Sequence, residues 1–211
     1  MKTRIPPLLL LALGACIPSL QPLYSDPVRG TVDLPEFLGT WSFEAPGQPG
    51  QTPTWKVSRG RGHTFLVEVL HQERATSLTG HVVEIAGEYY LDTFPNSMQV
   101  QQELGELAAA HLVPAHLIWW LRPEGEGFDL HLMADGAEGF EGRLVREPGL
   151  APRVLIEGGT RPVLTAAPER LRKVLEELGP EQVFQKKPSV RLRPLAAPGS
   201  PSGSGEGSTG G

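Results

Sequence analysis

Apolar and polar residues alternate through much of the first half of the chain, which is the pattern of β-strands that bury one face. Residues 63–71 give the clearest case, with Phe65, Val67 and Val69 sharing one face. Shorter runs of the same kind occur at 40–43, 54–58, 78–86 and 89–94. Because turn residues separate these runs closely, we expect an antiparallel meander.

The second half of the chain mixes strand patterns with helix patterns. Residues 114–122 predict a strand that Pro123 ends, residues 128–133 predict another, and residues 154–156 predict a last short strand. Residues 137–146 fit either a short helix or a strand.

Two helices are expected beside the strands. Residues 96–110 predict a middle helix or a long crossover. Residues 166–178 give the clearest helix, because four apolar residues recur at helical spacing and Thr165 can serve as the N-cap. The predicted fold class is therefore mainly β (α+β), an antiparallel meander with a middle helix and a C-terminal amphipathic helix.

The N-terminus has the pattern of a secretory signal peptide. Lys2 and Arg4 precede a short apolar run at 8–15, which is too short to cross a membrane as a helix. Small residues then lead to Cys16, the one cysteine of the chain. A single cysteine allows no intramolecular disulfide and no cysteine-rich zinc site.

Residues 13–16, Leu-Gly-Ala-Cys, resemble a bacterial lipobox. The resemblance implies cleavage before Cys16, acylation of its thiol, and a mature chain anchored in a membrane. Position 17 is Ile rather than the Asp that commonly retains lipoproteins in the inner membrane. We therefore expect the cell envelope, on the periplasmic face of the outer membrane if the host has two membranes. The alternative is an ordinary signal peptide with an incidental cysteine.

Composition divides the chain into four parts. We expect a signal peptide at 1–15, a lipidated tether at 16–33, a β-rich globular domain at 34–187 and a disordered Pro/Gly/Ser-rich tail at 188–211. The 211 residues are 39% hydrophobic and 20% charged, which suffices for one packed core. The net charge of −5 argues against a nucleic-acid partner bound through a basic surface.

Residues 34–41 resemble the opening of lipocalin-like (calycin) barrels, where a short helical turn leads into Gly-x-Trp on the first strand. Gly39 and Trp41 hold the matching positions, whereas the later Thr-Asp-Tyr motif of that family is absent. The resemblance implies a sheet that closes into a barrel, with Trp41 in its floor and room for a small apolar ligand.

A broader resemblance links the chain to small uncharacterised bacterial lipoproteins. It rests on the lipobox and on short motifs at 38–41, 90–92, 114–116 and 164–165. That family implies no activity for this chain.

The candidate chemistry is sparse. His116 and His131 could approach each other on adjacent strands, but no HExxH or HxH motif occurs, so we expect no metal and no cofactor. A buried His116 would bond a backbone carbonyl. No Gly-x-Ser-x-Gly occurs and Cys16 belongs to the anchor, so we predict no catalytic residue and no enzyme. An unrecognised hydrolase is the remote alternative.

Trp119 and Trp120 are consecutive, so on a strand their rings point to opposite faces. One belongs to the core, and the other lies outside or under a covering helix. With Trp41 and His116, they are the candidate ligand-contact or core residues.

The leading functional hypothesis is a non-enzymatic, membrane-anchored lipoprotein with a structural or protein-interaction role in the envelope. The alternative is a lipocalin-like carrier of a small apolar ligand. A large open cavity in the barrel would favour the carrier, and a barrel filled by side chains would favour the first hypothesis.

Overall fold

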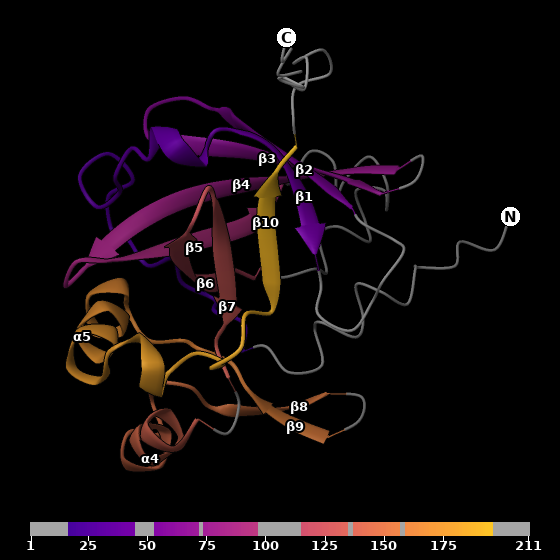
Figure 1. Ribbon diagram of the computed structural model, residues 1–211. Helices are drawn as coiled ribbons and strands as arrows, with labels where there is room; N and C mark the ends of the chain where they lie inside the picture. The colour runs from indigo at the N-terminus through magenta and orange to yellow at the C-terminus, as the bar shows by residue number, and fades with distance from the viewer. Residues whose placement is uncertain are drawn as a thin grey trace, which may run out of the picture.

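A computed structural model describes residues 17–44, 53–71, 74–96, 115–134, 137–156 and 159–195. Its centre is a closed, eight-stranded antiparallel barrel (Figure 1). The barrel strands are β1 (Gly39–Glu44), β2 (Thr54–Arg59), β3 (Thr64–His71), β4 (Arg74–Ile85), β5 (Glu88–Pro95), β6 (Leu117–Glu124), β7 (Gly127–Leu132) and β10 (Val190–Pro194). Neighbours follow chain order from β1 to β7, and β10 joins β7 to β1. The predicted mainly β fold, an antiparallel lipocalin-like barrel, is confirmed.

The strand that closes the barrel lies within the predicted disordered tail. β10 pairs with β1 over four positions and with β7 over three. Val190 and Leu192, which alternate with arginines, are buried in the barrel core. The tail prediction for 188–211 is therefore wrong at its start, because a half-buried strand pattern lies inside a Pro-rich context. Residues 196–211 lie outside the described residues.

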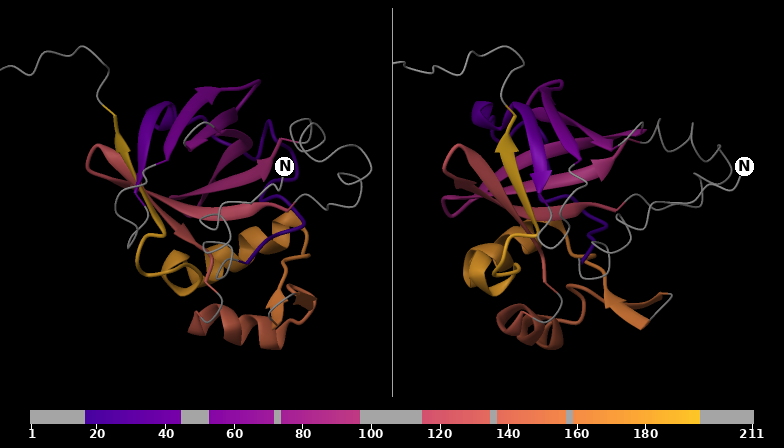
Figure 2. Two further views of the ribbon diagram at one scale, coloured as in Figure 1. Left: turned by 90° about the vertical axis from the view of Figure 1, so that its right-hand side faces the viewer. Right: turned by 45° about the vertical axis from the view of Figure 1, so that its right-hand side comes forward.

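A second layer covers one side of the barrel and comes from the chain between β7 and β10 (Figures 1 and 2). Its elements are α4 (Glu138–Arg146), β8 (Arg153–Ile156), β9 (Gly159–Pro162), α5 (Pro168–Leu178) and a 3-10 turn, η2 (Pro180–Gln182). The short strand predicted at 154–156 is β8, which pairs with β9 and is not the last strand.

The C-terminal amphipathic helix is confirmed as α5, and it buries Leu171, Val174 and Leu175. Its start differs from the prediction, since Ala167 is the N-cap and Pro168 holds the first helical position. The hydroxyl of Thr165 instead donates to the carbonyl of Gly149.

The inward side chains of the barrel strands form a packed interior. We call the aromatic cluster around Phe37 the floor of the barrel. The 3-10 turn η1 (Pro35–Phe37) places Phe37, which is 0% exposed, in the barrel core. Trp41 donates its indole N–H to the Phe37 carbonyl across 3.0 Å. Phe65 and Phe128 meet the Phe37 ring edge-on at centroid distances of 5.6 and 5.4 Å. Gly39, with a φ of +143° that favours glycine, carries the chain from this turn into β1.

The outward face of β4, β5 and β6 is also buried, because the second layer packs on it. We call this cluster the outer core, and Val83, Tyr90 and Trp120 belong to it. Trp119 belongs to the barrel interior instead. The two consecutive tryptophans therefore serve two separate cores, as strand alternation predicts.

Pro123 does not end its strand, because β6 continues to Glu124 with Pro123 opposite Phe128 in the register. The pairing of β6 with β5 stops at Leu121, so on that side Pro123 lies at a sheet edge, where proline is tolerated. Apart from Asn96, the middle helix predicted for 96–110 lies outside the described residues.

Candidate functional site

Residues 17–33, which we call the strap, run along the outside of the barrel and against the second layer (Figure 2). Ile17 and Leu23 are 2% and 0% exposed, and with Tyr24 they belong to the outer core. The prediction of a tether at 16–33 is therefore wrong for this part of the chain. The segment is mostly polar in composition, but these three residues pack in the outer core. Cys16 lies outside the described residues.

Backbone hydrogen bonds fasten both ends of the strap to the barrel. Near its start, the Ser19 amide donates to the His116 carbonyl across 2.9 Å, and the His116 amide donates back across 2.7 Å. Near its end, the Val32 amide donates to the Val82 carbonyl across 2.8 Å. The strap is therefore paired with barrel residues at both ends.

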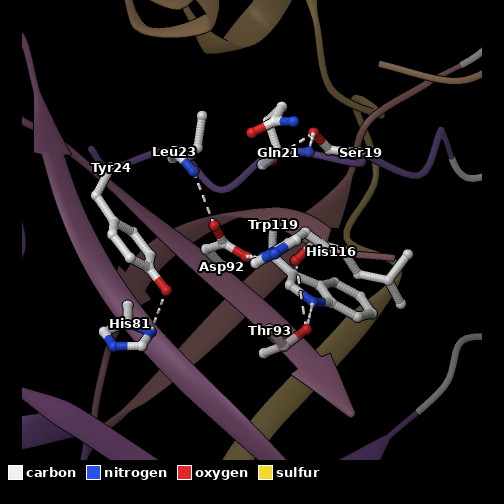
Figure 3. Close-up of polar contacts among 10 residues, drawn as sticks. Ser19, Gln21, Leu23, Tyr24, His81, Asp92, Thr93, His116 and Trp119 are labelled. Atoms are coloured by element: carbon white, nitrogen blue, oxygen red, sulfur yellow. Dashed lines mark hydrogen bonds and ion pairs between the residues drawn. The ribbon is translucent and has the colours of Figure 1, made fainter. Parts of the chain in front are cut away.

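A buried carboxylate holds the middle of the strap (Figure 3). Asp92 points outward from β5 and is 0% exposed. One of its oxygens accepts the Leu23 amide at 2.9 Å, and the other lies 2.7 Å from Nδ1 of His116. Asp92 thus joins the strap to the start of β6, and both of its oxygens have partners.

A histidine and a tyrosine form a second polar link beside this carboxylate (Figure 3). Nδ1 of His81, on β4, lies 3.0 Å from the Tyr24 hydroxyl, and its Nε2 lies 3.2 Å from the hydroxyl of Thr64. Burial lowers the pKa of His81, and Asp92 opposes this by favouring the charged form. Burial raises the pKa of the Tyr24 hydroxyl, so Tyr24 remains a neutral hydrogen-bonding group.

The lowered pKa of His81 predicts a loss of stability in acid. Because the unfolded chain binds a proton more readily than folded His81, the free energy of unfolding falls as the pH drops below the ordinary histidine value of about 6.5. The slope from one such group is at most about 1.4 kcal/mol per pH unit. Urea unfolding at pH 7 and pH 5 should show a smaller pH effect in His81→Gln than in the wild type. Equal effects in both proteins would contradict this assignment.

The Asp92–His116 pair has the form of a histidine oriented by a buried carboxylate, which also occurs in catalytic sites. Here both residues fasten the strap, and His116 is bonded to Asp92 rather than to the expected backbone carbonyl. Within the described ranges, no group of three or more His, Cys, Asp or Glu could hold a metal ion.

The structure does not join His116 to His131. Nδ1 of His131 lies 2.7 Å from the Gln185 carbonyl, and its ring packs on Trp120 at a centroid distance of 4.7 Å. Burial lowers the pKa of His131. Its place is the outer core, under the chain that leads into β10.

Sequence reasoning missed Asp92 and His81 as members of this cluster. Asp92 shares the outward face of its strand with Tyr90, which is 1% exposed. A carboxylate on a face that also carries a large apolar residue was the available signal. It pointed to a covering segment, but it did not identify the strap as that segment.

Aromatic rings other than those of the floor also pack in the barrel core. Trp55 packs against Phe43 at 5.6 Å and edge-on against Trp119 at 6.4 Å, measured between ring centroids. The Trp119 indole donates to the Thr93 hydroxyl across 3.1 Å. The Trp55 indole N–H is buried and has no hydrogen-bond partner among the described residues.

Among the described residues, two of the hollows lie outside the barrel. One of about 10 Å³ lies within the outer core, between Leu23 of the strap and Leu171 of α5. The other has about 210 Å³ and lies between α4 and the start of β8, where it is lined by Glu141, Leu144, Val145, Pro148, Ala151, Pro152 and Arg153.

Within the described part of the chain, no helix has the length and apolar character needed to cross a membrane.

Scans against protein-family models, curated proteins and solved structures found no match to this chain.

Proposed function

We propose that this protein is a lipid-anchored protein of the bacterial cell envelope with a non-enzymatic, contact-making role. Acylation at Cys16 would place the barrel at a membrane, on the periplasmic face of the outer membrane in a host with two membranes. The barrel itself would be a rigid support for contacts with other envelope components.

The filled barrel interior is the observation that carries this proposal. The Phe128 ring contacts the rings of Phe37 and Trp41 at the floor, and Trp55 and Trp119 pack against each other in the same core. Small barrels filled by side chains act as packed cores rather than as containers. A role through the outer surface fits this interior better than carriage of a ligand.

The strap supports the same proposal, because it determines how far the proposed acyl anchor lies from the folded domain. Ile17, the residue after the proposed acylated cysteine, is 2% exposed and packs in the outer core. The anchor would therefore begin at the surface of the folded domain, with no free linker of the kind that the composition suggests. A domain attached in this way is held close to the bilayer.

Replacement of the proposed acylated residue tests the anchor. Cys16→Ser should move the protein from the membrane fraction to the soluble fraction, because no thiol remains to be acylated. Its melting temperature should match that of a soluble wild-type domain, since position 16 precedes the packed strap. Fractionation after a carbonate wash measures the first effect. A Cys16→Ser protein that still pellets with membranes would refute the lipid anchor.

A lipocalin-like carrier is the second candidate function. One observation favours it: the unpartnered Trp55 indole N–H, which belongs to the barrel core and lies beside the half-buried Phe43. A buried donor without an acceptor is costly, and a bound ligand with an oxygen atom would satisfy it. A carrier would keep such a molecule through gentle purification.

A further inference from the structure

We propose that the outward face of β6, β7 and β10 binds acidic side chains of a partner protein through Arg122 and Arg191. This inference rests on the proposed contact-making role and identifies the chemistry of the partner. The partner would present several Asp or Glu residues on one exposed segment of its chain.

Three arginines surround one buried carboxylate on this surface, which we call the arginine face. Asp129 lies on β7 between two residues of the barrel core, so its side chain points outward, and it is only 4% exposed. Arg122 of β6 and Arg191 of β10 lie opposite Asp129 in the register, one on each side. Arg193 follows two residues later on the same face of β10. The strand order therefore brings all three arginines to one carboxylate.

The three arginines are not equally engaged with Asp129. Nη2 of Arg193 donates to the carboxylate across 3.1 Å. Nη2 of Arg122 and Nε of Arg191 lie 3.6 and 3.8 Å from it, and both distances are longer than a hydrogen bond. Asp129 thus attracts these two guanidinium groups without taking up their hydrogen-bond donors. Their side chains are 40% and 50% exposed, so a partner can reach them.

Trp120 restrains one of the two available guanidinium groups. The guanidinium carbon of Arg122 lies 5.5 Å from the centre of the Trp120 ring. Trp120 is itself buried, and its indole donates to Glu88 across 2.9 Å. A guanidinium group held against an aromatic ring loses less freedom when it binds a ligand. Because this planar group matches a carboxylate with two parallel hydrogen bonds, the arginine face favours carboxylate ligands.

The shape of the arginine face indicates the kind of ligand. Neither hollow described above is lined by its arginines, and the strands that carry them form the outside of the barrel (Figure 1). A single free carboxylate gains little from an exposed ion pair, because water screens the charges. Several carboxylates on one segment gain from being linked, since the second contact forms within the complex. This difference favours an acidic segment of a protein over a small free anion.

Two exposed carboxylates border the arginine face and compete with a partner. Glu124 lies 3.7 Å from Nη2 of Arg122, at the end of β6. Glu44 lies opposite Arg191 in the register of β1 with β10. Both are exposed side chains, so an incoming carboxylate can displace them at little cost. Removal of such a competitor should therefore strengthen binding of the partner.

Fluorescence anisotropy with a labelled oligoglutamate peptide tests the inference. The full mature protein is kept in micelles of dodecyl maltoside, which carry no charge. We expect Arg122→Gln and Arg191→Gln each to weaken peptide binding about tenfold, because each removes a charge-assisted contact. Glu124→Gln should strengthen it about twofold. Since Glu124→Gln leaves every arginine in place, it tests the arginine face even where an arginine variant fails to fold.

Arg146→Gln is the matched control. Arg146 is an exposed arginine on α4, outside the arginine face, and its replacement removes the same charge. It should change the affinity less than about twofold, because salt screens charges that do not touch the peptide. An oligoglutamine peptide of equal length controls for contacts with the peptide backbone, and polyphosphate serves as a second anionic probe.

The possible results separate this inference from the lipid anchor. Absence of oligoglutamate binding, equal binding of oligoglutamine, or arginine variants that bind like Arg146→Gln would overturn the arginine face and leave the anchor intact. Polyphosphate that binds through these arginines when oligoglutamate does not would overturn the acidic protein partner. A mature protein that carries no acyl groups but binds oligoglutamate through Arg122 and Arg191 would overturn the anchor and support this inference.

Discussion

A chain that ends at residue 187 should lose its cooperative folding transition, whereas a chain that ends at residue 195 should keep it. The first truncation removes β10, which pairs with both β1 and β7 and closes the barrel. It also removes Val190 and Leu192 from the core, and each buried aliphatic side chain contributes about 1.5–3 kcal/mol. With the strand pairing also lost, this is a large part of the ~5–15 kcal/mol that stabilises a typical domain.

Thermal unfolding followed by near-ultraviolet circular dichroism measures this effect, since the signal depends on ordered tryptophans. The chain ending at 195 is the matched control, because it lacks only the Pro/Gly/Ser-rich end of the sequence. If the chain ending at 187 melted cooperatively within a few degrees of the control, β10 would not be required and the closed barrel would be wrong.

The second large effect is expected at Asp92. Asp92→Ala leaves the buried Leu23 amide without an acceptor and removes the partner of His116. An unsatisfied buried donor costs about 1–3 kcal/mol, and the lost histidine contact adds to this. We expect a loss of about 2–4 kcal/mol in urea unfolding, with a smaller loss for Asp92→Asn, which keeps one acceptor oxygen.

The matched control for Asp92 is Asp33→Asn at the other end of the strap. Asp33 pairs with Arg59 at the surface, where such pairs contribute only about 0–1 kcal/mol. Hydrogen exchange gives a second readout, since the Leu23 amide should exchange faster in Asp92→Ala. An Asp92→Ala protein as stable as Asp33→Asn would show that the carboxylate does not hold the strap.

The strands and the amphipathic helix were predictable because their apolar residues follow a clear period. Residues 63–71 and 166–178 show the two periods, and both segments form the expected element. The opposite orientations of Trp119 and Trp120 followed from the same alternation. The Gly-x-Trp resemblance at Gly39 and Trp41 offered a closed barrel as one possibility, and strand periodicity left closure open until the structure showed it.

The strap was predicted to be a tether, and β10 to be part of a disordered tail. Both predictions were wrong because they rested on a composition typical of flexible segments. Both are short segments with Pro, Ser or Arg between a few apolar residues, so their average composition resembles that of a linker. Their order depends on distant partners: Leu23 needs Asp92, 69 positions away, and Leu192 needs β1 and β7. The strap therefore shows no clear period, and the alternation of Val190 and Leu192 with arginines in β10 is too short to outweigh the Pro-rich context around it.

Native mass spectrometry of the full protein, extracted gently from the membranes of its own host, tests the lipid anchor and the packed barrel in one experiment. We expect a chain that begins at Cys16, carries acyl groups there, and has no other molecule bound in its barrel. An unmodified Cys16 would contradict the lipid anchor. A small molecule that is bound reproducibly and lost on denaturation would contradict the contact-making role and favour the carrier.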